Sequence, residues 1–333
     1  MGDTQSNDPA LAQELKTAWH RLVDVLVPLR PGLHAYCRKL TRNLWDAEDL
    51  VQDTLVRAFG QWGVSYPPIR DPRAYLLRTA TNVWIDAIRR RETVANAPPD
   101  ATATTVPAAS VEMAAHVRQA SAHALQHLSP QETAAIVLKE AFDMTLEEIA
   151  EVLATSTGAV KAALHRGRER LEKAQAGTPT TRPPASRALI ERFIDRFNAR
   201  DVEGLVALTR EGTTAENVGN SYHSGHGPHG LPHFFTKVVH GHSEWPPETQ
   251  VEKSRLQLVD FEGEPIILSI AARKGREALT AVFRFEELDG AISRVRAYGF
   301  CPDTIRAVGE ALGMRVLTGL YRAPTPAPGM EWP

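Results

Sequence analysis

The stretch that decides the fold of this chain runs from Thr145 to Lys173 and reads TLEEIAEVLATSTGAVKAALHRGRERLEK. Thr145 and Glu148 have the spacing of a capping box, in which a hydroxyl and a carboxylate bond the free amides at the start of a helix. Apolar residues follow at helical spacing until Thr155-Ser156-Thr157, a run that favours turns and helix caps. The pattern predicts a short helix, a turn and a second helix.

The second predicted helix is basic on the sides that its apolar residues leave open. Its apolar side consists of Val160, Ala163, Leu164, Gly167 and Leu171. Its cationic flanks are Lys161, His165 and Arg168 on one side and Arg166 and Arg170 on the other. A helix-turn-helix places such a second helix in the major groove of DNA. DNA binding is therefore favoured, and the alternative is part of an ordinary helical bundle with a solvated basic face.

Composition limits what the rest of the chain can be. Its 333 residues suffice for two or three domains, and 43% hydrophobic with 23% charged residues is ordinary for a soluble protein. The net charge of −2 means that a nucleic acid must be met by local basic patches. Cys37 and Cys301 have no metal-binding or disulfide spacing, which fits a reducing compartment. Because neither a signal sequence nor a membrane-spanning run is recognisable, we expect a cytoplasmic protein.

A second informative helix is predicted from Asn43 to Trp62. Its apolar stripe steps by three and four and consists of Leu44, Ala47, Val51, Leu55, Ala58 and Trp62. Its opposite side is acidic and consists of Asp46, Asp49 and Asp53, flanked by Glu48 and Gln52. Acids early in a helix suit its dipole, so by themselves these residues favour a solvated amphipathic helix over a docking surface for a basic partner helix.

A basic helix is predicted next, from Pro72 to Arg91. Its apolar face consists of Leu76, Leu77, Ala80, Val83, Trp84, Ala87 and Ile88. Its polar face consists of Arg78, Asn82 and Arg89, and its basic end adds Arg90 and Arg91. Such a face suits phosphate contact and base stacking, although the last arginines also complement a helix C-terminus. For Trp84, a place in the core is favoured over a base-stacking role.

Weaker signals complete the first half of the chain. Residues 1–10 are expected to be disordered, and helical patterning covers 11–40 with a break at Pro28 and Pro31-Gly32. A helix is also predicted over 111–128. Pro130 directly after Ser129 has the chemistry of a capped helix start.

Three motifs follow one another along this half. They are Asp46-Ala-Glu-Asp-Leu-Val-Gln52, then Asn82 with Asp86 and Arg89-Arg90, then Leu128-Ser-Pro-Gln-Glu132 ahead of the helix-turn-helix. Together they resemble the extracytoplasmic-function (ECF) sigma factors of bacterial RNA polymerase, over about residues 11–173. The resemblance implies two all-α domains, a sigma region 2 helical bundle at 11–92 and a sigma region 4 helix-turn-helix at 111–175. A flexible linker rich in Ala, Thr and Pro joins them at 93–110.

The resemblance also implies partners and site residues. Core RNA polymerase would be bound, at the clamp helices of its β′ subunit, by Asp46, Glu48, Asp49, Gln52 and Asp53, and the β flap would be a further contact. The −10 promoter element would be opened and read by the loop at Tyr66–Asp71 and the helix after it, through Arg78, Asn82, Trp84, Arg89 and Arg90. The −35 element would be met by Ser156, Thr157, Lys161, His165, Arg166 and Arg168. No cofactor is implied.

After a second linker at 176–186 the chain continues where a minimal sigma factor ends. Ser186 precedes one predicted helix, and Asn198-Ala-Arg-Asp201 turns into another. Strand-like runs follow at Arg255–Phe261, Pro265–Ala272, Ala278–Phe285 and Ile292–Phe300, with a hairpin signal at Asp289-Gly290. Helices followed by a curved antiparallel sheet make an α+β domain, and a Pro-rich tail is expected at 323–333.

The opening phrase of this extension is Phe193-Ile-Asp-Arg-Phe-Asn-Ala-Arg-Asp201. It is similar to the start of SnoaL-like domains of the NTF2-like cone fold, and the similarity covers about residues 187–322. It implies a regulatory domain that acts in cis by contact with the sigma domains, in place of an anti-sigma protein. The alternative is a ligand-sensing or catalytic domain, which an open polar cone would favour and a cone filled with side chains would disfavour.

A histidine-rich loop separates the predicted helices from the strands. It contains His223, His226, His229, His233, His240 and His242. Histidines can ligate zinc, but Gly230 and Pro232 interrupt helical spacing here, and neither a nearby cysteine nor an HExxH pattern accompanies them. A polar loop is favoured over a metal site. Catalysis would need a polar residue that faces the interior of the cone, and the candidates on the strands are Arg284, Glu286, Arg294 and Arg296. The sequence does not determine which face of the sheet they are on.

Overall fold

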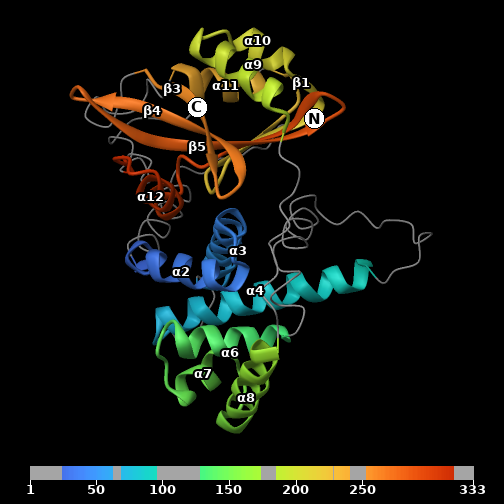
Figure 1. The fold of residues 1–333 in the computed structure, drawn as a ribbon, viewed down its shortest axis with the longest axis vertical. Coiled ribbons are helices and arrows are strands. Elements are labelled where there is room, and N and C mark those ends of the chain that lie inside the picture. The colour runs from blue at the N-terminus through green and yellow to red at the C-terminus, as the bar shows by residue number, and fades with distance from the viewer. Residues whose placement is uncertain are drawn as a thin grey trace, which may run out of the picture. The chain divides into compact units, whose positions relative to one another are not determined.

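The computed structural model describes residues 25–62, 69–95, 128–173, 185–227, 229–240 and 253–318. The chain divides into two compact units, within residues 1–180 and 181–333, and Figure 1 shows a helical first unit and a second unit of helices and strands. The predicted disordered start, the helix before residue 25, the helix at 111–127 and the Pro-rich tail lie outside the described residues. So do residues 66–68 of the loop at Tyr66–Asp71, and both linkers apart from a few residues at their edges. Among the described helices, none combines the length and hydrophobicity needed to cross a lipid bilayer.

The first unit begins with a bundle of three helices. Its elements are η1 (Val27–Leu29), α2 (Arg30–Thr41), α3 (Leu44–Trp62) and α4 (Pro72–Ala95). Arg42 adopts a left-handed conformation, with φ of 56°, that ends α2. The Asn43 side chain then accepts bonds of 2.9 and 3.0 Å from the amides of Trp45 and Asp46, which starts α3. Within the predicted stripe of α3, the fully buried residues are Leu44, Ala47, Val51 and Ala58.

The predicted helix-turn-helix is present in the same unit. Its elements are α6 (Pro130–Glu140), α7 (Leu146–Val152) and α8 (Thr157–Lys173). Thr145 and Glu148 complete the predicted capping box at α7. Ser129 caps α6, with Pro130 as the first helical residue, and the Ser156 hydroxyl caps α8 by accepting an amide bond of 3.2 Å.

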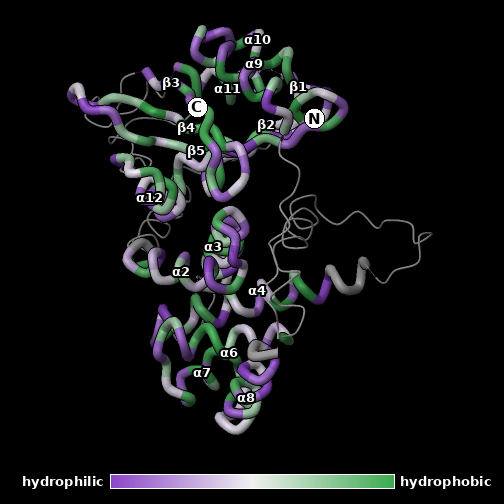
Figure 2. Tube along the Cα trace, viewed as in Figure 1, coloured by the Kyte–Doolittle hydropathy of each residue, from purple (hydrophilic) through white to green (hydrophobic). Residues whose placement is uncertain are grey.

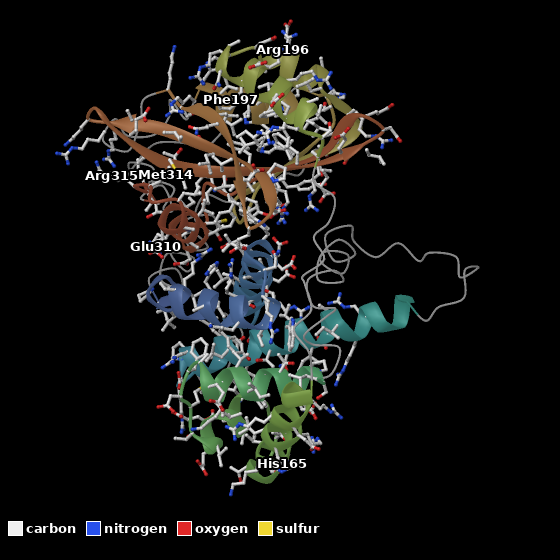
Figure 3. All side chains as sticks on the ribbon, viewed as in Figure 1. His165, Arg196, Phe197, Glu310, Met314 and Arg315 are labelled. Atoms are coloured by element: carbon white, nitrogen blue, oxygen red, sulfur yellow. The ribbon has the colours of Figure 1, made fainter. Side chains whose placement is uncertain are left out.

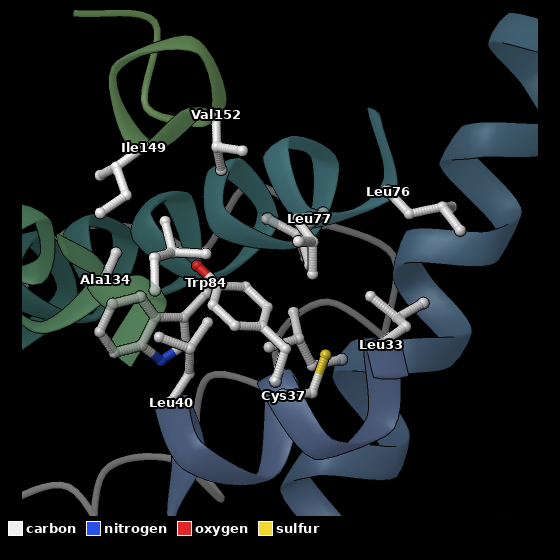
Figure 4. Close-up of a cluster of buried hydrophobic side chains, with 14 of the residues drawn as sticks. Leu33, Cys37, Leu40, Leu76, Leu77, Trp84, Ala134, Ile149 and Val152 are labelled. Atoms are coloured by element: carbon white, nitrogen blue, oxygen red, sulfur yellow. The ribbon is translucent and has the colours of Figure 1, made fainter. Parts of the chain in front are cut away.

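These later helices share one hydrophobic core with α2 and α4. Figure 4 shows Ala134, Ile149 and Val152 of α6 and α7 close to Leu77 and Trp84 of α4. All five side chains are at most 3% exposed. Residues that stand fifty or more positions apart in the chain therefore fill one interior, and the helix-turn-helix is part of a larger packed body.

The second unit has helices on both faces of a six-stranded sheet. Its elements are α9 (Arg187–Asn198), α10 (Val202–Ala207), β1 (Thr209–Asn217), β2 (Ser221–Ser224), α11 (Leu231–His240), β3 (Arg255–Phe261), β4 (Glu264–Arg273), β5 (Arg276–Leu288), β6 (Ala291–Ala297) and α12 (Pro302–Ala311). The strand order is β2-β1-β6-β5-β4-β3. Figure 1 shows α9, α10 and α11 together on one side of the sheet and α12 on the other. The α+β class is as predicted.

The sheet is mixed, whereas the sequence predicts an antiparallel one. β1 runs parallel to β6, with Ala215 opposite Val295, and it carries β2 as an antiparallel edge strand. The residues of β1 that point inward include Thr213 and Asn217, which are buried but polar. The hydropathy pattern of β1 therefore does not predict a strand, and only its pairing with β6 identifies it as one. The sequence analysis also misses β2, α11 and α12. Leu231–His240 forms a helix where a polar loop is predicted, because Pro232 falls in the first turn, where its missing N–H costs no helical hydrogen bond.

Two-residue hairpins connect β3 to β4, β4 to β5 and β5 to β6. Their turns are Glu262-Gly263, Lys274-Gly275 and Asp289-Gly290, and φ is positive at all six residues. Both central residues of a type I′ turn need this left-handed conformation, which glycine adopts without strain. The hairpin predicted at Asp289-Gly290 is confirmed, and the other two turns carry a similar pattern.

Aromatic side chains fill the space between α9–α11 and the sheet. Phe193 of α9 is fully buried, and its ring centroid lies 4.4 Å from that of Phe285, 5.8 Å from Phe235 and 6.4 Å from Phe197. Figure 2 shows hydrophobic and hydrophilic residues alternating along α9, as expected for a helix with one buried side. Side chains therefore occupy the interior of the cone where these rings meet.

Removing the central ring of this core should destabilise the second unit. Phe193→Ala deletes a fully buried ring with three aromatic neighbours, so we expect the free energy of unfolding to fall by about 3–5 kcal/mol. Tyr222→Ala serves as the control, because that ring is 61% exposed and its loss should cost less than about 0.5 kcal/mol. Denaturant titrations compare the two variants, and similar losses would contradict the assignment of Phe193 to the core.

Candidate nucleic-acid interface

The acidic side of α3 is divided between the interior and the surface. Asp46 and Glu48, which the resemblance assigns to polymerase binding, are 2% and 0% exposed. Asp49 and Gln52 are half-buried, and Asp53 is exposed. The acidic surface that another protein could reach is therefore smaller than the sequence predicts.

Glu48 takes part in a buried ion pair. Arg30 of α2, itself 2% exposed, donates to Oε1 of Glu48, and the Gln52 amide donates to the same oxygen at 2.6 Å. His34 Nε2 lies 3.9 Å from the other carboxylate oxygen. A buried carboxylate is tolerated only with such partners, so Glu48 joins α3 to α2 and stabilises the bundle.

The surface of α3 also carries an exposed apolar side chain. Val56 is 71% exposed and lies one helical turn beyond Gln52 and Asp53. A large hydrophobic residue beside carboxylates suits a partner helix that offers both apolar and basic side chains. The sequence analysis missed Val56, although its place outside the regular apolar stripe was a usable signal.

α4 presents most of its predicted DNA-binding residues and buries one. Asn82, Arg89 and Arg90 are exposed, and Arg78 is half-buried. Trp84 is only 1% exposed and belongs to the shared core, so its assignment as a DNA contact is wrong and the core interpretation is confirmed. The physical reason is its helical position, which places the indole on the apolar face of α4.

The first half of α8 carries exposed residues that the resemblance assigns to the −35 element. Lys161 and His165 are exposed and lie one turn apart, and Figure 3 shows His165 on the outer side of α8. Ser156 is the cap and Thr157 the first residue of this helix of 17 residues. Because free amides at a helix N-terminus favour phosphate, this end of α8 is chemically suited to a DNA backbone.

Three arginines of α8 pair with carboxylates of α6. Arg166 and Arg170 lie 2.9 and 2.6 Å from the two carboxylate oxygens of Glu132, and Arg168 pairs with Glu140. Burial alone would raise the pKa of Glu132, but a backbone amide and the two guanidinium groups hold that pKa below its usual value. These ion pairs orient α8 on α6. Arg166 and Arg168 would therefore meet DNA with guanidinium groups that α6 already holds in place, each with its side chain 54% exposed.

The histidine-rich segment that the sequence predicts as a polar loop is largely folded, with His223 in β2 and His233 in α11, and three of its imidazoles lie close together. The ring centroid of His233 lies 5.7 Å from that of His223 and 6.3 Å from that of His229, and His226 Nε2 lies 2.9 Å from the hydroxyl of Thr209. In the part of the chain that the structure describes, no three His, Cys, Asp or Glu side chains are placed to hold a metal ion. His240 is exposed at the end of α11, and the remaining predicted histidine, at position 242, lies outside the described residues.

The charged strand residues form ion pairs across the sheet. Arg294 and Arg296 of β6 both lie near Oε2 of Glu216 of β1, at 3.1 and 3.2 Å. Arg284 of β5 pairs with Glu264 of β4 at 2.7 Å. Alternate residues of a strand point to opposite faces, and the neighbours of these arginines belong to the core beneath α9–α11. The possible catalytic residues on the strands therefore face away from that core, and they are Arg284, Glu286, Arg294 and Arg296.

Family comparisons match the first unit twice. The family model described as Sigma-70 region 2 matches residues 27–93, which span η1 to α4. The family model described as Sigma-70, region 4 matches residues 118–171, which end within α8. The two matches stand in the order that the motifs predict.

Similar proteins carry the same kind of name. The ECF RNA polymerase sigma factor SigG of Mycobacterium tuberculosis is 33% identical over 211 residues, which cover 54% of this chain and 57% of that protein. The RNA polymerase sigma-E factor of Streptomyces avermitilis is 34% identical over 140 residues, which cover 41% of this chain and 74% of that protein. The crystal structure of the Mycobacterium tuberculosis extracytoplasmic function sigma factor SigJ aligns with 83% of this chain and 95% of its own, at 22% identity and a TM-score of 0.29. This chain thus spans less than two thirds of the length of SigG.

Two acids on one helix should separate a structural role from a surface role. Glu48→Ala removes the buried carboxylate that Arg30 contacts, so we expect the free energy of unfolding of the first unit to fall by about 3–5 kcal/mol. Asp53→Ala removes an exposed carboxylate and should change that energy by about 0.5 kcal/mol or less. Denaturant titration measures both variants, and equal effects would show that the acidic side of α3 is not divided in this way.

Proposed function

The chain belongs to the ECF sigma factors of the sigma-70 family, and from this premise we propose that it binds core RNA polymerase and directs promoter-specific initiation of transcription. The observation that carries the proposal is the pair of sigma-70 matches, each on helices whose exposed side chains suit the partner. Sigma factors are not enzymes as a family, and we propose that the whole chain, including the second unit, has no catalytic activity. A factor of this kind works beside its polymerase, in the cytoplasm.

Docking on the polymerase is proposed for the outward side of α3. This docking surface consists of Asp49, Gln52, Asp53 and Val56, and a partner with basic and apolar side chains, such as the β′ clamp helices, would complement it. Asp46 and Glu48 would act indirectly, by fixing α3 in the bundle. A further contact of the first unit with the β flap is proposed on the family resemblance.

Promoter recognition is proposed for two separate helices. At the −35 element, the N-terminal half of α8 would enter the major groove with Lys161 and His165 exposed. At the −10 element, the polar face of α4 would contact DNA through Arg78, Asn82, Arg89 and Arg90. Phosphate contacts from the arginines would position the helix, and Asn82 has the donor and acceptor needed for a base edge.

For the second unit we favour regulation in cis over catalysis. Support comes from the rings of Phe193, Phe235 and Phe285, which occupy the interior that a substrate or sensed ligand would need. The charged strand residues are engaged in ion pairs on the other face of the sheet. Regulation would proceed by contact with the sigma regions, which the covalent tether favours by raising local concentration.

Reversing the charges of the docking surface should weaken polymerase binding. Asp49→Lys with Asp53→Lys places two cations against a basic partner, so we expect the Kd for bacterial core RNA polymerase to rise about tenfold or more. Fluorescence-anisotropy titration of the labelled chain measures that Kd. Glu203→Lys with Glu211→Lys makes the same charge change at exposed sites of the second unit and controls for net charge. An unchanged Kd in the α3 variant would refute the docking assignment.

A phosphate contact from α8 should appear in the salt dependence of DNA binding. Lys161→Ala should weaken binding to duplex DNA and lower the slope of log K against log salt concentration by about 1, because one counterion fewer is released. Arg192→Ala, at an exposed site on α9, should leave the slope unchanged. Anisotropy titrations at several salt concentrations give both slopes, and the same slope for Lys161→Ala as for the parent would exclude groove contact there.

A further inference from the structure

One buried carboxylate of α6 holds two cations of α8. The side chain of Glu132 is 3% exposed, whereas those of Arg166 and Arg170 are 54% and 47% exposed. Nε of Arg166 donates to Oε1 of Glu132 at 2.9 Å, and a terminal nitrogen of Arg170 donates to Oε2 at 2.6 Å. The acid thus lies inside the protein, while the guanidinium groups that it holds reach the surface.

The carboxylate of Glu132 is itself fixed in place. It belongs to the capping box at the start of α6, where Oε2 also accepts the backbone amide of Ser129 at 2.9 Å. Burial raises the pKa of this carboxyl, but the Ser129 amide and the two guanidinium groups outweigh burial and hold the pKa below its usual value. The group is therefore ionised at neutral pH and has a defined orientation.

A close approach of the two helices brings α8 within reach of this acid. α8 packs on α6 (Figure 1), and Gly167 lies at their contact. A Cβ atom at Gly167 would lie 3.4 Å from Cβ of Glu132 and 2.5 Å from Cδ1 of Ile136, so the isoleucine would have to move. The missing side chain at Gly167 therefore lets the backbone of α8 run beside Glu132, with Arg166 as the neighbouring residue.

The ion pair uses only one side of the Arg166 guanidinium. Its Nε–H bonds Glu132, and its two terminal amino groups form no hydrogen bond with any residue that the structure describes. A guanidinium is planar and rigid, so holding Nε also sets the direction of the terminal groups. Those groups are the paired donors that match the oxygens of a phosphate. Arg166 is thus oriented while its phosphate-binding donors stay available.

The position of Arg166 on α8 suits the backbone of a DNA duplex. At about 100° per residue, Lys161 and Arg166 lie about 140° apart around the helix, with His165 between them. When such a helix lies in the major groove, side chains toward the floor of the groove meet base edges, and those on its flanks reach the phosphates. We therefore expect Lys161 and Arg166 at opposite walls of the groove.

We propose that Glu132 is a positioning residue for −35 recognition, which holds Arg166 by its Nε–H and so directs the terminal amino groups of this arginine at a DNA phosphate. The inference rests on the proposed promoter-binding function and adds a residue that does not itself touch DNA. Two guanidinium groups against one carboxylate leave a net charge of +1, so the cluster still attracts a phosphate. Because the rotamer of Arg166 is already restricted, binding costs less conformational entropy.

Positioning and charge predict opposite effects for removal of this acid. Glu132→Gln and Glu140→Gln each remove one negative charge from α6. Glu140 is the matched control, because it pairs with Arg168 at the surface, where its own side chain is 55% exposed. Charge alone predicts that both variants bind DNA more tightly than the parent chain. Positioning predicts that Glu132→Gln binds about threefold to tenfold more weakly than Glu140→Gln.

A double-mutant cycle separates positioning from a general loss of structure. Anisotropy titration of the full-length chain with a short fluorescein-labelled duplex of mixed sequence measures each Kd. Arg166→Ala should lower the slope of log K against log salt concentration by about 1, which identifies the phosphate contact. In the Arg166→Ala background, Glu132→Gln should no longer weaken binding, because no guanidinium remains to be oriented.

Glu132→Asp gives a second test without a change of net charge. Its carboxylate is one methylene further from Arg166, so binding should weaken here too, whereas Glu140→Asp should match the parent. Circular dichroism verifies the helical content of each variant, and the aspartate pair decides the question where Glu132→Gln does not fold.

Two outcomes would overturn the inference. One is equal affinity of the Glu132 and Glu140 variants for the duplex, and the other is the same weakening by Glu132→Gln with and without Arg166. Absence of duplex binding by the parent chain would instead contradict the proposed function, and this inference with it.

Discussion

The apolar contact of α6 and α7 with α2 and α4 is the constraint on which the first unit depends. Trp84 illustrates it, because its large ring lies in the shared core close to Leu40 of α2 and Ala134 of α6 (Figure 4). A buried aromatic side chain removes an apolar area from water that few other residues can match. Separating these helices would expose part of that interior to water, at a cost in free energy.

Charges in this unit act in two distinct environments. Inside, Arg30 and Glu48 join α2 to α3 where water is excluded, and each depends on the other. At the surface, the pairs of Arg168 with Glu140 and of Arg78 with Glu151 are reached by solvent, so each is individually weak and open to competition. That difference allows the same residue types to stabilise the bundle in one place and to exchange partners in another.

The second unit is organised around one sheet whose two faces differ in chemistry. Its face beneath α9–α11 is apolar and filled with rings, whereas the charged residues of β5 and β6 gather on the other face in pairs with Glu216 and Glu264. The parallel pairing of β1 with β6 makes this possible, because it brings Glu216 next to Arg296 from the far end of the unit's sequence. Among the described residues of this unit, ion pairs thus hold the charged side chains of β5 and β6, and aromatic rings fill the interior beneath α9–α11.

The sequence by itself determined the local elements. The capping residues Thr145 and Ser129, the turn at Asp289-Gly290 and the apolar stripe of α3 were all readable, because each depends on residues within one helical turn or one hairpin. Tertiary structure alone decided which acids of α3 are buried, that Trp84 lies inside, that β1 is a strand, and that Arg78 meets Glu151. Each of these outcomes depends on a neighbour far away in the chain, and local periodicity contains no information about such a neighbour.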